Sequence, residues 1–259
     1  MNKKINTIIF KVCSPLMTLA AWEIMSRTGV LDIRFFPPPS LIFADIYKLF
    51  AEGILLKDIW ISMFRICCGL LMGGLPGLIL GVLMGRSILI NKFFQPLIAL
   101  TFPIPKLAII PLIILLFGIG EFSKIFIVAV GVFFLIVINT FHGVSRIDRI
   151  YFDLCKIYKY SLYDRWRHII IPGALPAIFN GLRLATGTAF ILIVGSEFVA
   201  ADSGIGYRIW VSWEVFQIIH MFSALFVLAF LGWAANGIIK ILERWAMPWK
   251  TDYQRECEE

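Results

Sequence analysis

Several charged residues lie inside otherwise apolar stretches of the sequence. Arg65 is one of them, and three others are candidates for chemistry: Lys106, Arg183 and Glu197. An ionisable group in such a setting is expensive to bury and is a functional hypothesis by default. The two cations could attract an anion, and Glu197 could pair with either cation. Two structural interpretations stay open: Arg183 could extend its side chain to the nearby end of its stretch, and Lys106 could simply pair with Glu197. We predict that these three residues border a path for a small anion.

Catalytic constellations are missing from the sequence. The three histidines, His142, His168 and His220, are scattered and form no H-E-x-x-H pair. No phosphate-binding G-x-x-x-x-G-K-[ST] loop occurs, and no serine stands in a G-x-S-x-G turn. The five cysteines have no spacing that suits a metal site or a disulfide framework. The sequence therefore predicts a protein that is not an enzyme, binds no metal or cofactor of its own, and takes any energy for work from elsewhere.

The elements that must position these charges are long apolar segments. The sequence has 259 residues, of which 59% are hydrophobic and 16% charged, with a mean hydropathy of +0.85. Soluble domains are about 45–50% apolar and about 25% charged, so a bilayer is the natural solvent for this chain. A spanning helix needs about 20 mostly apolar residues, and runs of this length exclude barrel strands. Six segments qualify: 7–25, 63–85, 93–117, 125–141, 177–200 and 218–242.

We predict an all-α integral membrane protein with about six transmembrane helices. The first segment follows two lysines but has no small-residue cleavage site after it, so we interpret it as a span and not as a signal peptide. Most of the 24 lysines and arginines fall on one side if both termini are cytoplasmic, as the positive-inside rule requires. This topology explains the net charge of +7 without a nucleic-acid partner.

Glycine and proline mark two of the predicted spans. Pro103, Pro105 and Pro111 interrupt the third span and predict a break that faces protein. Residues 41–56 show helical apolar spacing on one face, typical of a helix on the outer membrane interface. The second span carries glycines four residues apart, which predict a close helix-packing seam. These are Gly69, Gly73, Gly77, Gly81 and Gly85.

The longest cytoplasmic loop, residues 143–176, has the signals of two short helices. Ser145 with Asp148, and Ser161 with Asp164, are helix-start signatures. Apolar residues between them recur at helical spacing, and we expect Pro172 to end the second helix. The apolar stripe needs a partner, because a cytoplasmic loop cannot bury it alone. The basic residues of the loop favour an acidic partner surface or lipid headgroups, although positive-inside topology alone could account for some of them.

The same loop resembles the "EAA" loop of binding-protein-dependent ABC importer permeases. Asp153-Leu154-Cys155, Lys159 and Ile169-x-Ile171-Pro172 stand at the spacing of that motif. The likeness extends over nearly the whole chain, through the elements that follow. They are Trp22-Glu23, Pro37-Pro38-Pro39-Ser40, Pro103-Ile-Pro105-Lys106, Phe117-Gly118-Ile-Gly120-Glu121, Gly181-Leu-Arg183, Glu197 and Ser203-Gly204-Ile-Gly206. Within the family the chain is most similar to the branch that serves nitrate, taurine and aliphatic sulfonates, which also includes permeases for pyrimidine precursors of thiamine.

The resemblance implies a role and a set of partners. Two permeases, here a homodimer, would form the path, and an ABC ATPase subunit carrying ATP and Mg would grip each loop. A periplasmic or lipid-anchored solute-binding protein would deliver a small, anionic solute, and the chain would lie in the cell inner membrane among its lipids. By this resemblance the loop's ATPase-docking residues are Ile150, Asp153, Leu154, Cys155, Tyr158, Lys159, Ser161 and Pro172.

The sequence departs from the family pattern inside the loop. Two small residues of the motif are Leu154 and Cys155 here, and its usual glycine is Lys159. A lysine in a left-handed turn costs roughly 1 kcal/mol or more. Either the turn is drawn differently or the partner's groove has changed to match. Two other classes stay open: an ATP-independent secondary transporter or channel, which would predict matched repeat halves, and a membrane-embedded enzyme, which would need the clusters that are missing.

Overall fold

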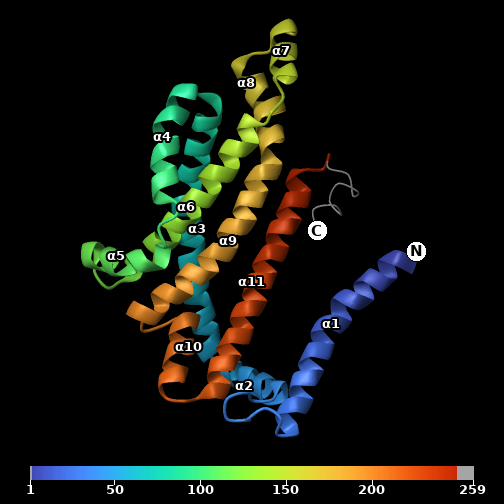
Figure 1. Ribbon diagram of the computed structural model, residues 1–259, viewed down its shortest axis with the longest axis vertical. Helices are drawn as coiled ribbons and strands as arrows, with labels where there is room; N and C mark the ends of the chain where they lie inside the picture. The colour runs from blue at the N-terminus through green and yellow to red at the C-terminus, as the bar shows by residue number, and fades with distance from the viewer. Residues whose placement is uncertain (1, 250–259) are drawn as a thin grey trace. The chain divides into compact units, whose positions relative to one another are not determined.

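The computed structural model describes residues 2–249, with side chains described for 13–199 and 201–249. Within this part of the chain every regular element is a helix (Figure 1). The all-α prediction is confirmed. The chain divides into two compact units, one of residues 1–61 and 202–229, and one of residues 62–201 and 230–259. We call them unit 1 and unit 2.

Unit 1 holds α1 (Asn2–Arg27), α2 (Pro39–Ala51), α10 (Ile205–Glu214) and the first parts of α3 (Ile54–Arg86) and α11 (Ile218–Ala246). The Trp22-Glu23 pair holds α1 to the start of α2. Glu23 Oε2 accepts a hydrogen bond from the Ser40 backbone N–H at 3.0 Å, and Oε1 accepts one from the Ser40 hydroxyl at 2.8 Å. The Trp22 ring packs on Phe222 of α11, with centroids 5.4 Å apart.

The predicted interfacial helix of residues 41–56 is shorter than expected. It is α2, which ends at Ala51, and a turn with Gly53 at φ +74° leads into α3. Leu55 and Leu56 therefore belong to α3. α2 is amphipathic: Ile42 and Leu49 are buried, whereas Tyr47 is 78% exposed.

Unit 2 holds the remaining helices. They are α4 (Ile88–Thr101), η1 (Lys106–Ile109), α5 (Ile110–Phe117), α6 (Glu121–Ser145), α7 (Arg149–Ile157), α8 (Leu162–Arg165), η2 (Trp166–Ile170) and α9 (Ile171–Ala200). α6 and α9 lie side by side along most of their length (Figure 1). A Cβ placed on Gly131 of α6 would clash with the Leu192 side chain of α9, and one on Gly143 would lie 2.6 Å from Ala177 Cβ, so the two backbones approach closely.

The glycine stripe of α3 forms the predicted packing seam, and its partner is α6 of the same chain. A Cβ placed on Gly81 would lie 2.7 Å from the Val137 carbonyl oxygen and 2.7 Å from the Thr140 Cβ. Gly69, Gly73, Gly77 and Gly85 meet other α6 residues at similarly close range. The spacing of four residues therefore serves close approach of two backbones within one subunit.

Four helices of the described chain are long and apolar enough to cross a membrane: Ile54–Arg86, Glu121–Ser145, Leu162–Val199 and Ile218–Ala246. The third predicted span is broken, as its prolines indicated: α4 and the η1–α5 segment meet at a bend of 85°. Counting this pair as one span gives five. A span at residues 7–25, the total of six and the cytoplasmic position of both termini stay predictions.

Candidate functional site

The loop of residues 143–176 forms a capped helix pair at one end of unit 2. The Asp148 side chain accepts a hydrogen bond from the Ile150 backbone N–H at 3.0 Å, which starts α7. Ser161 and Asp164 form a complete capping box, with each side chain bonded to the other's backbone N–H at 3.2 Å. The second helix start is confirmed as predicted, whereas the first differs in detail, because Asp148 is itself the N-cap of α7 and Ser145 is the last residue of α6. Because the caps satisfy otherwise unpaired N–H groups, they fix where each helix begins.

Lys159 adopts the left-handed conformation in which the family motif has glycine. Its φ is +52°. The Tyr160 N–H donates to the Cys155 carbonyl at 2.9 Å and the Lys159 N–H donates to the Lys156 carbonyl at 3.2 Å, which is the Schellman pattern at a helix C-terminus. Of the two explanations offered for Lys159, the turn is therefore not drawn differently. Lys159 is in the left-handed, strained conformation that glycine would adopt without strain.

The α7–α8 pair exposes apolar side chains. Ile150 is 62% exposed, Ile157 72% and Leu162 69%, and Leu154 and Tyr158 are exposed as well. We call these five residues the α7–α8 apolar face. Cys155 differs from the other predicted docking residues, because it is 2% exposed and packs inside the loop. Asp153 is exposed and pairs with Lys156 at 2.8 Å.

Pro172 does not end the second helix of the loop, and that prediction is wrong. Helix runs without interruption from Leu162 to Val199. A proline lacks an N–H and clashes with the carbonyl four residues earlier, which here belongs to His168. The turn that precedes Pro172 is π-helical, from Trp166 to Ile170. This wider turn accommodates the ring, so the proline stands in the first turn of α9, where it is tolerated.

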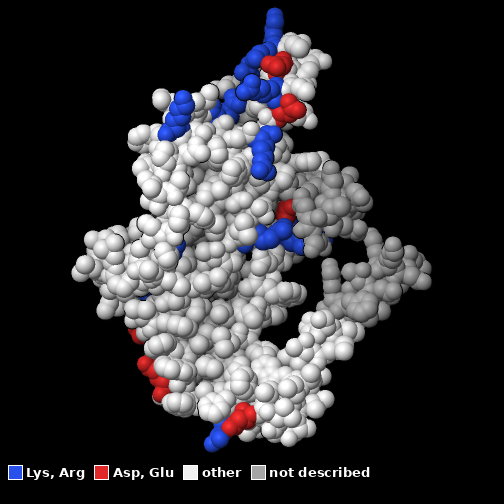
Figure 2. Space-filling model, in the orientation of Figure 1, with Lys and Arg blue, Asp and Glu red and all other residues white. Residues whose placement is uncertain are grey.

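Basic side chains surround the loop. Figure 2 shows lysines and arginines gathered over the end of unit 2 that carries α7 and α8, next to a few carboxylates. The six basic residues of the loop are Arg146, Arg149, Lys156, Lys159, Arg165 and Arg167, against Asp148, Asp153 and Asp164. The positive balance suits an acidic protein surface or anionic lipid headgroups.

Glu197 pairs with Arg65, which overturns the expectation that its partner is Lys106 or Arg183. Arg65 Nη1 lies 2.6 Å from Glu197 Oε1, and both side chains are fully buried. The Ser62 hydroxyl donates to the same carboxylate at 2.8 Å. The pair joins α3 to α9. Sequence reasoning noted Arg65 only as a charge within a span, and its separation of 132 residues from Glu197 gave no signal of the pairing.

Arg65 also forms a two-point contact with Glu121 at the start of α6. Arg65 Nε and Nη2 lie 2.6 Å from the two oxygens of Glu121, and Lys124 Nζ lies 3.2 Å from Oε1. The Glu121 side chain is 53% exposed. Arg65 therefore connects three helices through charge-assisted hydrogen bonds, a geometry that the planar guanidinium favours.

Lys106 hydrogen-bonds to backbone carbonyls at the break in the third predicted span. Its ammonium group donates to the carbonyls of Thr101, Phe102 and Ile104 at 2.9, 3.0 and 2.9 Å. It also lies 4.4 Å from the centre of the Phe134 ring. An ammonium has three N–H donors, so these carbonyls use all of them. The arrangement satisfies carbonyls at the helix break that Pro103 and Pro105 create.

Arg183 and the Glu243 side chain of α11 form a separate ion pair. The Arg183 Nη2 lies 2.5 Å from Glu243 Oε2, with Arg183 38% exposed and Glu243 13% exposed. The three predicted path residues, Lys106, Arg183 and Glu197, are thus in three different contacts and do not converge on one site.

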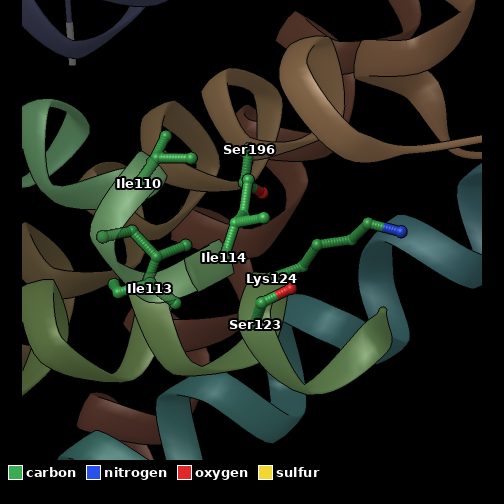
Figure 3. A pocket seen from close by; sticks show the side chains of 7 residues that line it. Ile110, Ile113, Ile114, Ser123, Lys124 and Ser196 are labelled. Atoms are coloured by element: carbon green, nitrogen blue, oxygen red, sulfur yellow. The ribbon is translucent and has the colours of Figure 1, made fainter. Parts of the chain in front are cut away.

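A small pocket lies beside α5, and its polar side chains are bonded to other groups of the chain (Figure 3). Ile110, Ile113 and Ile114 form one wall, and the Lys124 side chain extends away from them. Both hydroxyls that line the pocket are bonded to nearby carbonyls: Ser123 to Gly120 at 2.9 Å, and Ser196 to Ile193 at 2.8 Å. The ammonium group of Lys124, which also lines the pocket, pairs with Glu121 at 3.2 Å. No group of three or more histidines, cysteines or carboxylates capable of holding a metal occurs among the described residues.

A broken span, a glycine seam and an exposed, capped helix pair are features of a helical membrane protein, and comparison with known proteins shows its class. The fold is similar to that of an inward-facing methionine ABC transporter, MetNI, with a TM-score of 0.62, 17% identity, and coverage of 75% of this chain and 96% of the other. It is also similar to an amino acid ABC transporter solved with histidines, with a TM-score of 0.58, 15% identity, and coverage of 81% and 97%. Identities this low establish the fold alone.

The chain belongs to the family described as "binding-protein-dependent transport system inner membrane component", whose model matches residues 77–249. It is 37% identical to the putative aliphatic sulfonates transport permease SsuC of Escherichia coli, over 92% of this chain and 91% of the relative. It is 31% identical to SsuC of Bacillus subtilis, over 93% and 87%. The nitrate import permease NrtB of Synechococcus elongatus is 31% identical, over 81% and 78%.

The resemblance inferred from the sequence is confirmed by these matches. The chain is a transport component, the permease subunit of an ABC importer, and a multi-pass protein of the inner membrane. The family as a whole works with an ATPase and with a solute-binding protein.

Proposed function

We propose that this chain forms, as a homodimer, the translocation path of an importer for a small anion of the sulfonate, taurine or nitrate class. Support for the solute class comes from the relatives, which are named for aliphatic sulfonates, taurine and nitrate. In this proposal Lys106, Arg183 and Glu197 border the path, and their contacts within the chain hold the helices around it.

The loop 143–176 is the proposed docking site of a separate ATPase subunit that holds ATP and Mg. The α7–α8 apolar face carries this proposal. Five apolar side chains on a capped helix pair are unsuited to exposure in the cytoplasm, and an amphipathic helix binds by placing such a face in a groove. In this assignment Ile150, Asp153, Leu154 and Tyr158 contact the partner directly. Cys155, Lys159, Ser161 and Pro172 hold the loop in shape.

Co-purification from native membranes tests the docking proposal. The tagged chain is extracted in mild detergent, and its partners are identified by mass spectrometry. We expect a phosphate-loop ATPase and a second copy of the permease. Recovery of the chain with no ATPase, together with uptake that persists after ATP depletion, would instead support an ATP-independent transporter or channel.

Uptake by cells tests the solute class. Cells that lack the chain are supplied with an alkanesulfonate, taurine or nitrate as the limiting source of sulfur or nitrogen. Growth on one of these solutes should fail and should return when the chain is restored. Normal growth on all three would contradict the proposed class.

A further inference from the structure

A groove of about 620 Å³ lies within unit 2 beside the loop of residues 143–176, which we call the coupling loop. The end of α6, the N-terminal part of α7, η2 and the first turns of α9 line it, together with Trp249. This volume is within the range of sites that hold a ligand or a peptide segment. The groove is separate from the α7–α8 apolar face: Tyr151 lines the groove, whereas Ile157, on the same helix, does not.

The walls of the groove combine apolar surface with positive charge. Ile147, Tyr151 and Pro172 supply apolar and aromatic surface, Arg146 supplies a positive charge, and His168 supplies an imidazole whose Nδ1 lies 3.1 Å from the Asp164 carbonyl oxygen. Arg146 is exposed and has no side-chain partner among the described residues. Asp148 is the acidic group of the lining, and its carboxylate accepts the hydrogen bond that starts α7. The groove therefore suits a segment with carboxylates and at least one aromatic side chain.

The chain supplies such a segment at the mouth of the groove. Trp249 lines the groove and is the last residue that the structure describes. Residues 250–259 lie outside the described residues, and their sequence is Lys-Thr-Asp-Tyr-Gln-Arg-Glu-Cys-Glu-Glu. Four of these ten residues are acidic and two are basic, the opposite balance from the loop. An extended chain covers about 3.3 Å per residue, so residue 257 can reach about 26 Å from Trp249.

We propose that residues 250–259 bind in this groove of their own chain. The aromatic ring of Tyr253 would pack on Tyr151. The carboxylates near the end of the segment would pair with Arg146. Bound there, the segment would connect α7 to the first turns of α9 and would hold the coupling loop in one position. The proposal concerns contacts within the chain and does not depend on the solute or on the identity of the ATPase.

Disulfide cross-linking tests the proposal, because Cys257 is a native reporter within the segment. The other cysteines are replaced, Cys155 by alanine because it is buried and Cys13, Cys67 and Cys68 by serine. Tyr151→Cys then places a partner in the groove. Ile157→Cys is the matched control on the same helix, and at 72% exposure it is more accessible than Tyr151 at 55%. Isolated membranes that contain the full chain, expressed without its ATPase subunit so that Ile157 is uncovered, are treated with copper phenanthroline, and the products are mapped by mass spectrometry.

We expect Cys257 to cross-link to Tyr151→Cys about tenfold faster than to Ile157→Cys, because binding raises the local concentration of the tail at the groove. Adding Arg146→Glu should remove this preference. His168→Cys provides a second groove position and should behave like Tyr151→Cys. Equal rates at both positions of α7, or retention of the preference with Arg146→Glu, would overturn the proposal. A product that links two copies of the chain would also overturn it, because the groove would then hold the neighbour's segment.

Discussion

Arg65 and Glu197 form a fully buried ion pair between α3 and α9, with 2.6 Å between Arg65 Nη1 and Glu197 Oε1. Charges in such a place are tolerated only when they are paired and hydrogen-bonded. Arg65 meets this condition twice, because it also holds Glu121 at the start of α6. The guanidinium is thus the point at which three helices of unit 2 are joined.

Replacing Arg65 should destabilise the protein more than replacing either of its carboxylate partners. Arg65→Leu leaves the buried Glu197 carboxylate without its cation, and removing one partner of a buried pair costs about 3–5 kcal/mol. Glu121→Gln should cost less, because that side chain is 53% exposed and Arg65 keeps Glu197. Thermal unfolding of the purified protein in detergent measures the order. Arg34→Gln, which breaks an exposed pair with Asp32, is the control and should change little. Equal effects of Arg65→Leu and Arg34→Gln would refute the role of Arg65.

Features that depend on local spacing were predictable from the sequence. The glycine stripe, the two helix caps and the proline break each rest on residues within one or two turns of one another, so their chemistry is visible in the chain itself. The pairing of Arg65 with Glu197 was missed because it joins positions 132 residues apart. Its partner depends on how α3 and α9 pack, and neither periodicity nor charge pattern specifies that packing.

Pro172 shows a second kind of failure. Its usual effect is to end a helix, and the sequence contains no mark of the π turn at Trp166–Ile170 that lets the helix continue. The turn is defined by tertiary contacts: Ile170 is buried in a cluster with Val144 and Ala174. The rule that proline ends a helix therefore failed here, because packing around Ile170 accompanies a π turn that makes room for the Pro172 ring.

Lys159→Gly should stabilise the end of α7. Lysine at φ +52° carries a left-handed strain that glycine avoids, worth about 1 kcal/mol. Lys159→Val should have the opposite effect, because a β-branched residue at positive φ is strongly disfavoured. Hydrogen exchange of the α7 amides measures both changes. Slower exchange with valine than with glycine would show that the turn is not under this strain.

The glycine seam should not tolerate a large side chain. Gly81→Leu would force α3 away from α6, since even its Cβ would lie 2.7 Å from the Val137 carbonyl oxygen. We expect loss of folded protein from the membrane fraction. Gly74→Ala is the control within α3, because its Cβ would meet only Val132 Cγ1 at 3.9 Å. In that variant the amount of protein should be unchanged or should rise, as alanine favours a helix by about 1 kcal/mol over glycine.

Asp153→Arg should reduce the amount of ATPase that co-purifies with the chain. The side chain is 64% exposed, so the change should leave the fold intact and act on the docking surface. Ile157→Asp, at a position 72% exposed on the α7–α8 apolar face, should have the same effect. Asp153→Glu keeps the carboxylate and should retain the partner. Unchanged co-purification and unchanged transport with both disruptive variants would exclude this surface as the docking site.

Lys106→Gln separates a structural role from a direct contact with solute. The ammonium group uses its three N–H donors on the carbonyls of Thr101, Phe102 and Ile104, so we expect glutamine to lower the amount of folded protein. Uptake at limiting solute, measured per folded molecule, should stay close to the wild-type rate. A loss of about tenfold per folded molecule, which corresponds to about 1.4 kcal/mol, would instead indicate that Lys106 attracts the solute. Arg183→Gln is the parallel variant, because the Arg183 charge is already paired with Glu243 within the chain. We expect the same result for it as for Lys106→Gln.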